Sequence, residues 1–339
     1  MQPYLWKILT ASAVSLLTAT IALYFLIPYL IRKAFLDIPN ARSSHKKVTP
    51  RGGGIGIVLG ILAGAGSAYL LGLPIPPLSF FAGFLLMAGI SFLDDKKNLP
   101  AGLRFGVHLV AMALVMYATG GLKKLPFPPP LNFELGWIGY LISGIWIIAV
   151  INFFNFLDGI DGYAGSQALI AGLSIAFISW GNALSVIGLC IAFSSLGFLL
   201  YNWHPAKIFM GDVGSVSLGF AFATLPFYSP LPSSEPLIYS MALFLWFFLA
   251  DGAFTLIKRI LNKEKIWEAH RTHLYQRLHQ TGWNPRKVVV FSMGMALVVA
   301  AFQLYCYRLG NAFTWWSLGL GFLLFSVFLL VVFQREKKI

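Results

Sequence analysis

The chain has 339 residues, of which 58% are hydrophobic and only 11% are charged. A soluble domain is about 45–50% apolar and about 25% charged, so this composition excludes soluble globular, disordered and disulfide-scaffold proteins. The formal net charge of +13 does not indicate a soluble nucleic-acid binder, because the mean hydropathy of +0.76 is far too high for one. The remaining class is a polytopic membrane protein. Cys190 and Cys306 lie in apolar runs, and we interpret both as packing residues.

Eleven apolar runs predict an all-α protein that crosses a membrane about 11 times. They form one integral membrane domain over residues 1–339. The first run is too long for a signal-peptide core, so we expect it to be retained. The runs cover residues 5–31, 53–71, 78–93, 105–120, 135–151, 163–180, 183–200, 214–228, 237–257, 288–307 and 313–333.

The positive charges indicate which helix ends face the cytoplasm. Of the 25 Lys and Arg residues, 21 lie on one face, which predicts an outside N-terminus and a cytoplasmic C-terminus. Ten of the twelve Asp and Glu residues lie on that face too, so we expect the active site at the cytoplasmic surface. The face comprises the C-terminal tail and the loops near residues 32–52, 94–104, 152–163, 201–213 and 258–287.

The first of these loops joins basic residues to three consecutive glycines. Arg42, His45, Lys46, Lys47 and Arg51 precede Gly52, Gly53 and Gly54. Consecutive glycines let backbone N–H groups approach an anion closely, and a helix N-terminus favours negative charge. The segment therefore indicates either a phosphate site or a basic topology loop beside a closely packed glycine patch.

Two adjacent acids, Asp94 and Asp95, stand at the predicted inner end of the third helix. Carboxylates at a membrane boundary cost solvation energy and are functional candidates by default. They suit a divalent ion or a general base. A solvated helix end compensated by Lys96 and Lys97 is the alternative.

The strongest local signal is segment 152–165, which holds two Asn and two Asp residues and no Lys or Arg. If the turn is helical, Asn152, Asn155 and Asp158 recur every three residues on one face, and Asp161 continues the row. Interleaved glycines let a phosphate or a metal come close to the backbone. This pattern favours a metal–nucleotide pocket over a packing surface.

A second glycine-rich segment, residues 202–215, places Asp212 between Gly211 and Gly214. Asp212 offers one hard oxygen ligand beside free N–H donors. Phe209 offers a ring on which a base can stack. An Asp that only caps the following helix is the alternative.

The largest inner loop contains segment 268–279, which we predict to be an amphipathic helix with Leu274 and Leu278 on one side. Its three histidines suggest zinc, but no Cys and only Glu268 accompany them, which makes a poor closed site. An Arg- and His-rich helix at the membrane surface suits phosphate binding better. A basic helix that only fixes topology is the alternative.

In this order, the segments resemble the polyprenyl-phosphate N-acetylhexosamine-1-phosphate transferase superfamily, which includes WecA-, TagO- and MraY-like enzymes. The resemblance spans residues 37–280 and rests on four ordered motifs. The matching positions are Asp37, Pro39, Arg42, His45, Pro50, Gly52 and Gly53, then Asp94 and Asp95, then Asn152, Asn155, Asp158, Gly159, Asp161 and Gly162, and finally Pro205 to Ser215.

The resemblance implies transfer of a sugar 1-phosphate from a UDP-N-acetylated sugar to undecaprenyl phosphate, with release of UMP. It implies Mg²⁺ as the cofactor, which Mn²⁺ can replace, with Asp212 and Asp158 as ligands. The implied catalytic residues are Asp94, Asp95, Asp158 and Asp161, and the implied substrate-binding residues are Lys46, Lys47, Asn152, Asn155, Lys207, Phe209, His270, Arg271 and His273.

The resemblance further implies a multi-pass homodimer in a bacterial inner membrane, with the lipid bilayer and no nucleic acid as partner. Tyr275 and Gln276 stand where the WecA-like pattern has histidines, and this variant is similar to members that initiate O-antigen synthesis. The alternatives are an MraY-type phospho-N-acetylmuramoyl-pentapeptide transferase and a lipid-intermediate flippase, which would place its acids in mid-span. A CDP-alcohol phosphotransferase fits less well, because the segment after Asp158 lacks the Ala-Arg of its signature.

Overall fold

The computed structural model describes residues 2–39, 47–229, 235–265, 270–310 and 313–338. These residues form thirteen α-helices, one short 3-10 helix and one pair of two-residue strands. The elements are α1 (Gln2–Arg32), β1 (Leu36–Asp37), β2 (Thr49–Pro50), α2 (Gly54–Leu70), α3 (Leu78–Lys97), α4 (Ala101–Thr119), α5 (Ile138–Phe156), α6 (Tyr163–Ile178), α7 (Ala183–Asn202), α8 (Asp212–Thr224), η1 (Leu225–Tyr228), α9 (Glu235–Phe244), α10 (Trp246–Leu261), α11 (Leu274–Gln280), α12 (Pro285–Leu309) and α13 (Thr314–Glu336).

The chain is an all-α polytopic membrane protein, as its apolar runs predict. In lipid every backbone N–H and C=O must find its partner inside the protein, which a helix achieves locally. Among the described residues, seven helices are long and apolar enough to cross a membrane, or eight if the bent pair α9–α10 counts as one span. Helices occupy all eleven predicted stretches. However, α2 and α6 are shorter apolar helices, so eleven crossings and the orientation of the termini stay predictions.

The predicted continuous helix over residues 237–257 is wrong. The helix is interrupted at Leu245, and the helices on either side of this residue are bent by 76° relative to each other. Neither Pro nor Gly stands at the break, so the sequence carries no local sign of it. The reason is tertiary: Gln167 on α6 donates a hydrogen bond from Nε2 to the Phe244 carbonyl (2.7 Å), which satisfies a backbone group near the bend.

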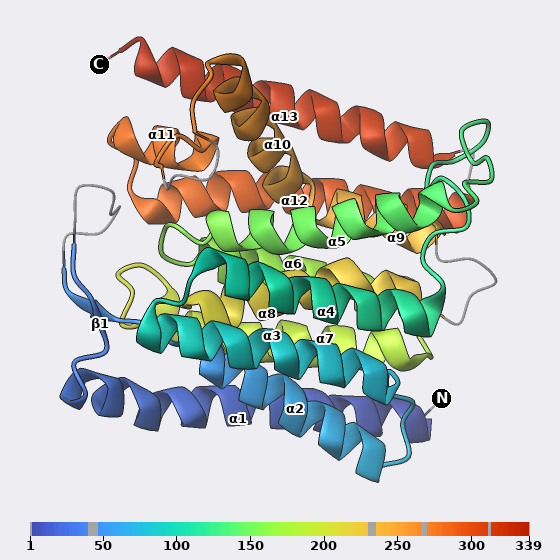
Figure 1. The fold of residues 1–339 in the computed structure, drawn as a ribbon, viewed down its shortest axis with the longest axis horizontal. Helices are drawn as coiled ribbons and strands as arrows, with labels where there is room; N and C mark the ends of the chain where they lie inside the picture. The colour runs from blue at the N-terminus through green and yellow to red at the C-terminus, as the bar shows by residue number, and fades with distance from the viewer. Residues whose placement is uncertain (1, 40–46, 230–234, 266–269, 311–312, 339) are drawn as a thin grey trace.

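The long helices run side by side, with α1 and α2 at one edge of the bundle and α12 and α13 at the other (Figure 1). β1, α11 and the C-terminus lie at one end of the bundle, and the N-terminus lies at the opposite end. Three segments that the charge pattern assigns to one face therefore gather together.

The centre of the bundle is closely packed around α7 and α8. Every residue of α8 after Asp212 is buried. Gly172 on α6 and Gly188 on α7 allow those helices to touch, because a Cβ added at either glycine would lie 2.8 Å from the carbonyl oxygen of the other. This rigid core holds the first residue of α8, Asp212, in a fixed position at the end of the bundle.

Candidate active site

A cavity of about 690 Å³ opens at the end of the bundle that carries β1 and α11. Its walls come from the strand pair, the end of α3, the α5–α6 loop, the α7–α8 segment and the region of α11. The lining residues are Asp37, Lys47, Thr49, Arg51, Asp95, Asn155, Asp158, Gly159, Ile160, Asp161, Asn202, His204, Pro205, Ala206, Phe209, Gly211, Asp212, Ser215, Gln276, His279 and Pro285.

The three consecutive glycines join β2 to the segment before α8. The N–H groups of Gly52 and Gly53 both donate to the Phe209 carbonyl (3.1 and 2.9 Å), and the N–H of Gly54 donates to Met210 (2.8 Å). A Cβ at Gly54 would come 2.0 Å from the backbone nitrogen of Gly214. Of the two interpretations that the sequence left open for this segment, the structure supports the closely packed glycine patch, because these amides already have backbone acceptors. The glycines pack closely against the segment before α8. This contact places the neighbouring Arg51 in the cavity wall.

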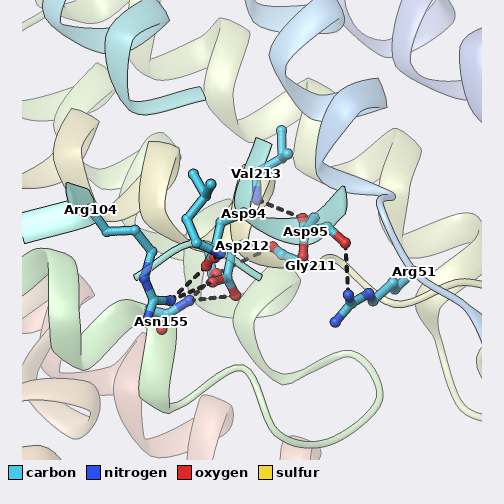
Figure 2. A network of polar contacts seen from close by, with 10 residues as sticks. Arg51, Asp94, Asp95, Arg104, Asn155, Gly211, Asp212 and Val213 are labelled. Carbon is cyan, nitrogen blue, oxygen red and sulfur yellow. Dashed lines mark hydrogen bonds and ion pairs between the residues drawn. The ribbon is translucent and has the colours of Figure 1, made fainter. Parts of the chain in front are cut away.

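Asp94 and Asp95 are buried, with 7% and 6% of their surface exposed, so they are not a solvated helix end. Asp94 accepts hydrogen bonds from the Leu99 N–H at Oδ1 (2.7 Å) and from Arg104 Nη1 at Oδ2 (2.6 Å). The Asp95 side chain accepts from the Val213 N–H (3.3 Å), and its carbonyl accepts from Arg51 Nη2 (2.7 Å). Figure 2 shows the two acids turned to different partners. Only Asp95 lines the cavity.

Asp212 faces the cavity from the first turn of α8. Its Oδ1 accepts from Asn155 Nδ2 at 3.1 Å, and the same amide donates to Ser215 Oγ at 2.9 Å. Its Oδ2 lies 3.8 Å from Arg104 Nη1, so Arg104 stands between Asp94 and Asp212 (Figure 2). The Asp212 side chain keeps 35% of its surface exposed. It is therefore positioned but only partly paired.

Asp158 lies among the other carboxylates of this cavity. Burial, together with the charges of Asp212, Asp95 and Asp161, raises the pKa of Asp158 to about 7. Within the described residues, no three His, Cys, Asp or Glu side chains form a ready-made metal cage. Mg²⁺ usually binds one or two carboxylates together with water and substrate phosphates rather than a complete protein cage. A set of partly paired acids that repel one another fits this ion, and Asp212 and Asp158 are the residues that could hold it.

Asp161 and Asn202 tie the α5–α6 loop to the α7–α8 segment. Asp161 Oδ2 accepts from the Ala206 N–H (3.0 Å) and contacts His204 Nδ1 (2.6 Å). Asn202 accepts from the Gly162 N–H at Oδ1 and donates from Nδ2 to the Ile208 carbonyl, each at 2.9 Å. These bonds fix two loops that share one wall of the cavity with Phe209.

The structure brings seven of the predicted site residues into the cavity wall: Lys47, Asp95, Asn155, Asp158, Asp161, Phe209 and Asp212. Asp94 lies beside them through Arg104. Lys207 is exposed and outside the lining, and Lys46 falls outside the described residues. The predicted helical row from Asn152 to Asp161 is wrong, because α5 ends at Phe156 and Asn152 bonds to Ile148 within its own helix.

The predicted helix over 268–279 is only partly right. Residues 266–269 lie outside the described part of the chain, and α11 begins at Leu274. His273 is buried, with Nδ1 3.3 Å from Asp251 Oδ1. Burial and the neighbouring His273 lower the pKa of His270 to about 4. None of the predicted phosphate-binding residues His270, Arg271 and His273 lines the cavity; Gln276 and His279 do.

Other polar residues of the site were not among the site residues predicted from the sequence. Sequence signals existed for five of them: Asp37 and Ser215 stand in the matched motifs, Gln276 at the variant position, Arg51 directly before the glycines and His204 directly before Pro205. For the others nothing local indicated the site, since their position depends on how distant helices pack. The residues missed are the wall residues Asp37, Thr49, Arg51, Asn202, His204, Ser215, Gln276 and His279, together with Arg104 beside the wall.

Comparison with known proteins gives a consistent assignment. Residues 77–229 match the family described as "Glycosyl transferase family 4". The chain is 33% identical to a probable undecaprenyl-phosphate N-acetylglucosaminyl 1-phosphate transferase of Bacillus subtilis, over 97% of this chain and 90% of that protein. It is 29% identical to a decaprenyl-phosphate N-acetylglucosaminephosphotransferase of Mycobacterium leprae, over 81% and 78% of the two chains. A phospho-N-acetylmuramoyl-pentapeptide-transferase of Bacillus licheniformis is 28% identical, over 90% and 98%. The chain belongs to glycosyl transferase family 4, the superfamily of polyprenyl-phosphate sugar-1-phosphate transferases.

Proposed function

We propose that this enzyme transfers an N-acetylhexosamine 1-phosphate from a UDP-sugar to undecaprenyl phosphate and releases UMP. An oxygen of the lipid phosphate forms a new P–O bond to the sugar-linked phosphorus, and the bond from that phosphorus to UMP breaks. One phosphoanhydride replaces another. The observation that carries the proposal is a single cavity that holds carboxylates for a metal beside Lys47 and Arg51 for phosphate oxygens.

The chain's own residues mainly bind the donor diphosphate and the lipid phosphate and orient them toward each other. Lys47 and Arg51 lie in the cavity wall, where their charges attract the diphosphate. Asn155 fixes the Asp212 carboxylate through a 3.1 Å hydrogen bond. Mg²⁺ held by Asp212 and Asp158 would supply further charge neutralisation. Chelation should abolish UMP release, and added Mg²⁺ or Mn²⁺ should restore it; activity that survives chelation would contradict the metal proposal.

We assign Asp94 a positioning role rather than that of a base. Both of its oxygens already accept hydrogen bonds, from Leu99 and from Arg104. A phosphate monoester with a second pKa near 6 is also mostly dianionic at pH 7 and has little proton to give. Activity of Asp94→Asn should stay low across pH 6–9. Recovery at high pH would indicate a base instead.

N-acetylglucosamine is the donor sugar we favour, because relatives from two genera carry that sugar in their names. UDP-N-acetylmuramoyl-pentapeptide is the second candidate, because the family also contains phospho-N-acetylmuramoyl-pentapeptide-transferases. We further propose that the product is the first lipid-linked sugar of a cell-surface polysaccharide at the cytoplasmic face of a bacterial inner membrane. The O-antigen pathway is a prediction from the variant at Tyr275 and Gln276.

Membranes containing the enzyme, supplied with Mg²⁺ and a panel of radiolabelled UDP-sugars, provide the test. The panel includes UDP-GlcNAc, UDP-GalNAc, the UDP-linked 6-deoxy sugars FucNAc and QuiNAc, and UDP-N-acetylmuramoyl-pentapeptide. UMP release that requires undecaprenyl phosphate supports the transferase, and the best donor identifies the sugar. No turnover with any donor would favour the flippase. Asp212→Asn is the inactive control, and Glu134→Gln, in an exposed pair with Lys124, is its charge-matched counterpart.

A further inference from the structure

Asp161 and His204 form a close pair in the cavity wall. Asp161 lies on the α5–α6 loop and His204 on the α7–α8 segment, and both line the cavity. His204 Nδ1 lies 2.6 Å from Asp161 Oδ2, which also accepts from the Ala206 N–H at 3.0 Å. The Asp161 side chain is 12% exposed, whereas that of His204 is 34% exposed. The acid is thus the inner member of the pair and the imidazole the outer one.

The hydrogen bond to Asp161 determines what the rest of the ring can do. When one imidazole nitrogen is held by a carboxylate, the other nitrogen becomes the one available to a ligand, and its orientation is fixed. With Nδ1 against Asp161, Nε2 lies on the opposite edge of a ring that is one-third exposed. It can accept from a hydroxyl or N–H group, or donate to a phosphate oxygen when the ring is protonated.

The backbone around His204 is anchored from three directions. Its carbonyl accepts from Arg286 Nε on α12 at 2.6 Å. Asn202, two residues earlier, is bonded to both Gly162 and Ile208. The imidazole is therefore held in place before any substrate binds, which is the arrangement expected of a group that reads a ligand.

We propose that His204, oriented by Asp161, binds the UMP half of the donor through Nε2. This rests on the proposed function. Phe209, on the same segment and also in the wall, offers a face on which a base can stack. The ends of α3 and α4 near Asp94 and Asp95 expose the apolar side chains of Phe92, Leu93, Leu103 and Phe105, which suits the lipid substrate.

The test compares wild type with His204→Phe, which keeps a ring but no nitrogen, and His204→Gln, which keeps a polar group. His108→Phe on α4, outside the cavity, is the matched control. We expect His204→Phe to raise the KM for the UDP-sugar and the inhibition constant of UMP together, by about 10-fold for one lost hydrogen bond of about 1.4 kcal/mol. The KM for undecaprenyl phosphate should not change. Thermal midpoints in detergent identify a variant that fails to fold, and His204→Gln then replaces it.

Uridine as a second inhibitor identifies the group that Nε2 contacts. If His204→Phe weakens inhibition by uridine and by UMP equally, Nε2 contacts the nucleoside. If it weakens inhibition by UMP alone, Nε2 contacts the phosphate. Both results support the proposal. Asp161→Asn should add little to His204→Phe, because the acid acts through the ring. Unchanged inhibition by UMP, or a change confined to the lipid substrate, would overturn it. Wild-type enzyme that released no UMP would instead refute the proposed function.

Discussion

Asp251 and Asp212 are acids at the same end of the bundle, and they differ in what occupies their oxygens. Asp251 on α10 is fully buried. It accepts from the N–H groups of Leu274 and Tyr275 (2.9 and 3.2 Å) and from Thr255 Oγ1 (3.0 Å), and it contacts His273 Nδ1 at 3.3 Å. Both oxygens of this carboxylate have hydrogen-bond donors from the protein itself, and these bonds attach α11 to α10.

Asp212, in contrast, accepts a hydrogen bond from Asn155, lies 3.8 Å from Arg104, and has the like-charged Asp94 beside it. Its negative charge contributes to the raised pKa of Asp158 in the same cavity. Burying an acid with its hydrogen bonds made stabilises a fold, whereas gathering acids that repel one another destabilises it. The difference separates a carboxylate that serves the structure from one that is left for a ligand.

The largest effect should come from Asp212→Asn. Removing a charge that holds Mg²⁺ and phosphates together should lower kcat about 100-fold or more. The thermal midpoint should not fall, because repulsion with the neighbouring acids is relieved. UMP release and thermal unfolding, measured beside Glu134→Gln, check both parts. An active Asp212→Asn enzyme would remove the distinction from Asp251.

Asp251→Ala should behave in the opposite way. Each buried N–H that loses its acceptor costs about 1–3 kcal/mol, so the thermal midpoint should fall clearly. Hydrogen exchange should accelerate at Leu274 and Tyr275, while α6 stays protected. Activity should fall about 10-fold because α11 is lost from the cavity wall. A loss of this size is typical when a residue that supports a site from behind is removed. Undisturbed exchange in α11 would show that Asp251 does not hold it.

The sequence predicted the acids of the site better than their supports. Asp158 and Asp161 stand out because glycines and amides surround them in a segment without Lys or Arg, and Asp212 stands out because it lies between Gly211 and Gly214. Asp251 stands in an apolar helix, and its partners at Leu274 and Tyr275 follow more than twenty residues later. Such a bond depends on the packing of two helices, which periodicity does not report.

The errors have the same cause. The row from Asn152 to Asp161 assumed that a local repeat continues, but α5 ends at Phe156. The bend at Leu245 is supported by Gln167 from another helix. The all-α membrane fold was predictable from hydropathy because lipid leaves the backbone few choices. The helix ends were not, since tertiary hydrogen bonds determine them.

A smaller effect should distinguish the two regions by pH. Asp158 has a raised pKa of about 7, while an unfolded Asp has one of about 4. Its contribution to stability is therefore full below pH 4 and is lost as the pH rises through about 7. The fall in thermal midpoint from pH 5 to pH 8 should be smaller in Asp158→Asn than in wild type or Glu134→Gln. An identical fall in all three would mean that Asp158 ionises freely in the folded protein.

The smallest effect concerns the point where the two regions touch. A Cβ at Gly159, beside Asp158, would lie 2.1 Å from Tyr275 Oη and 2.9 Å from Gln276 Nε2. Gly159→Ala should therefore push α11 outward and raise the KM for the UDP-sugar a few-fold, with little change in kcat. Because Tyr275→Phe removes the nearest atom, it should recover part of the loss in the double variant while having little effect alone. Recovery would show that the substitution acts through α11. A double variant no better than Gly159→Ala would place the damage in the α5–α6 loop itself. In that case the Tyr275 ring, which packs on Tyr163 at 4.5 Å, would already have moved away from the new methyl group.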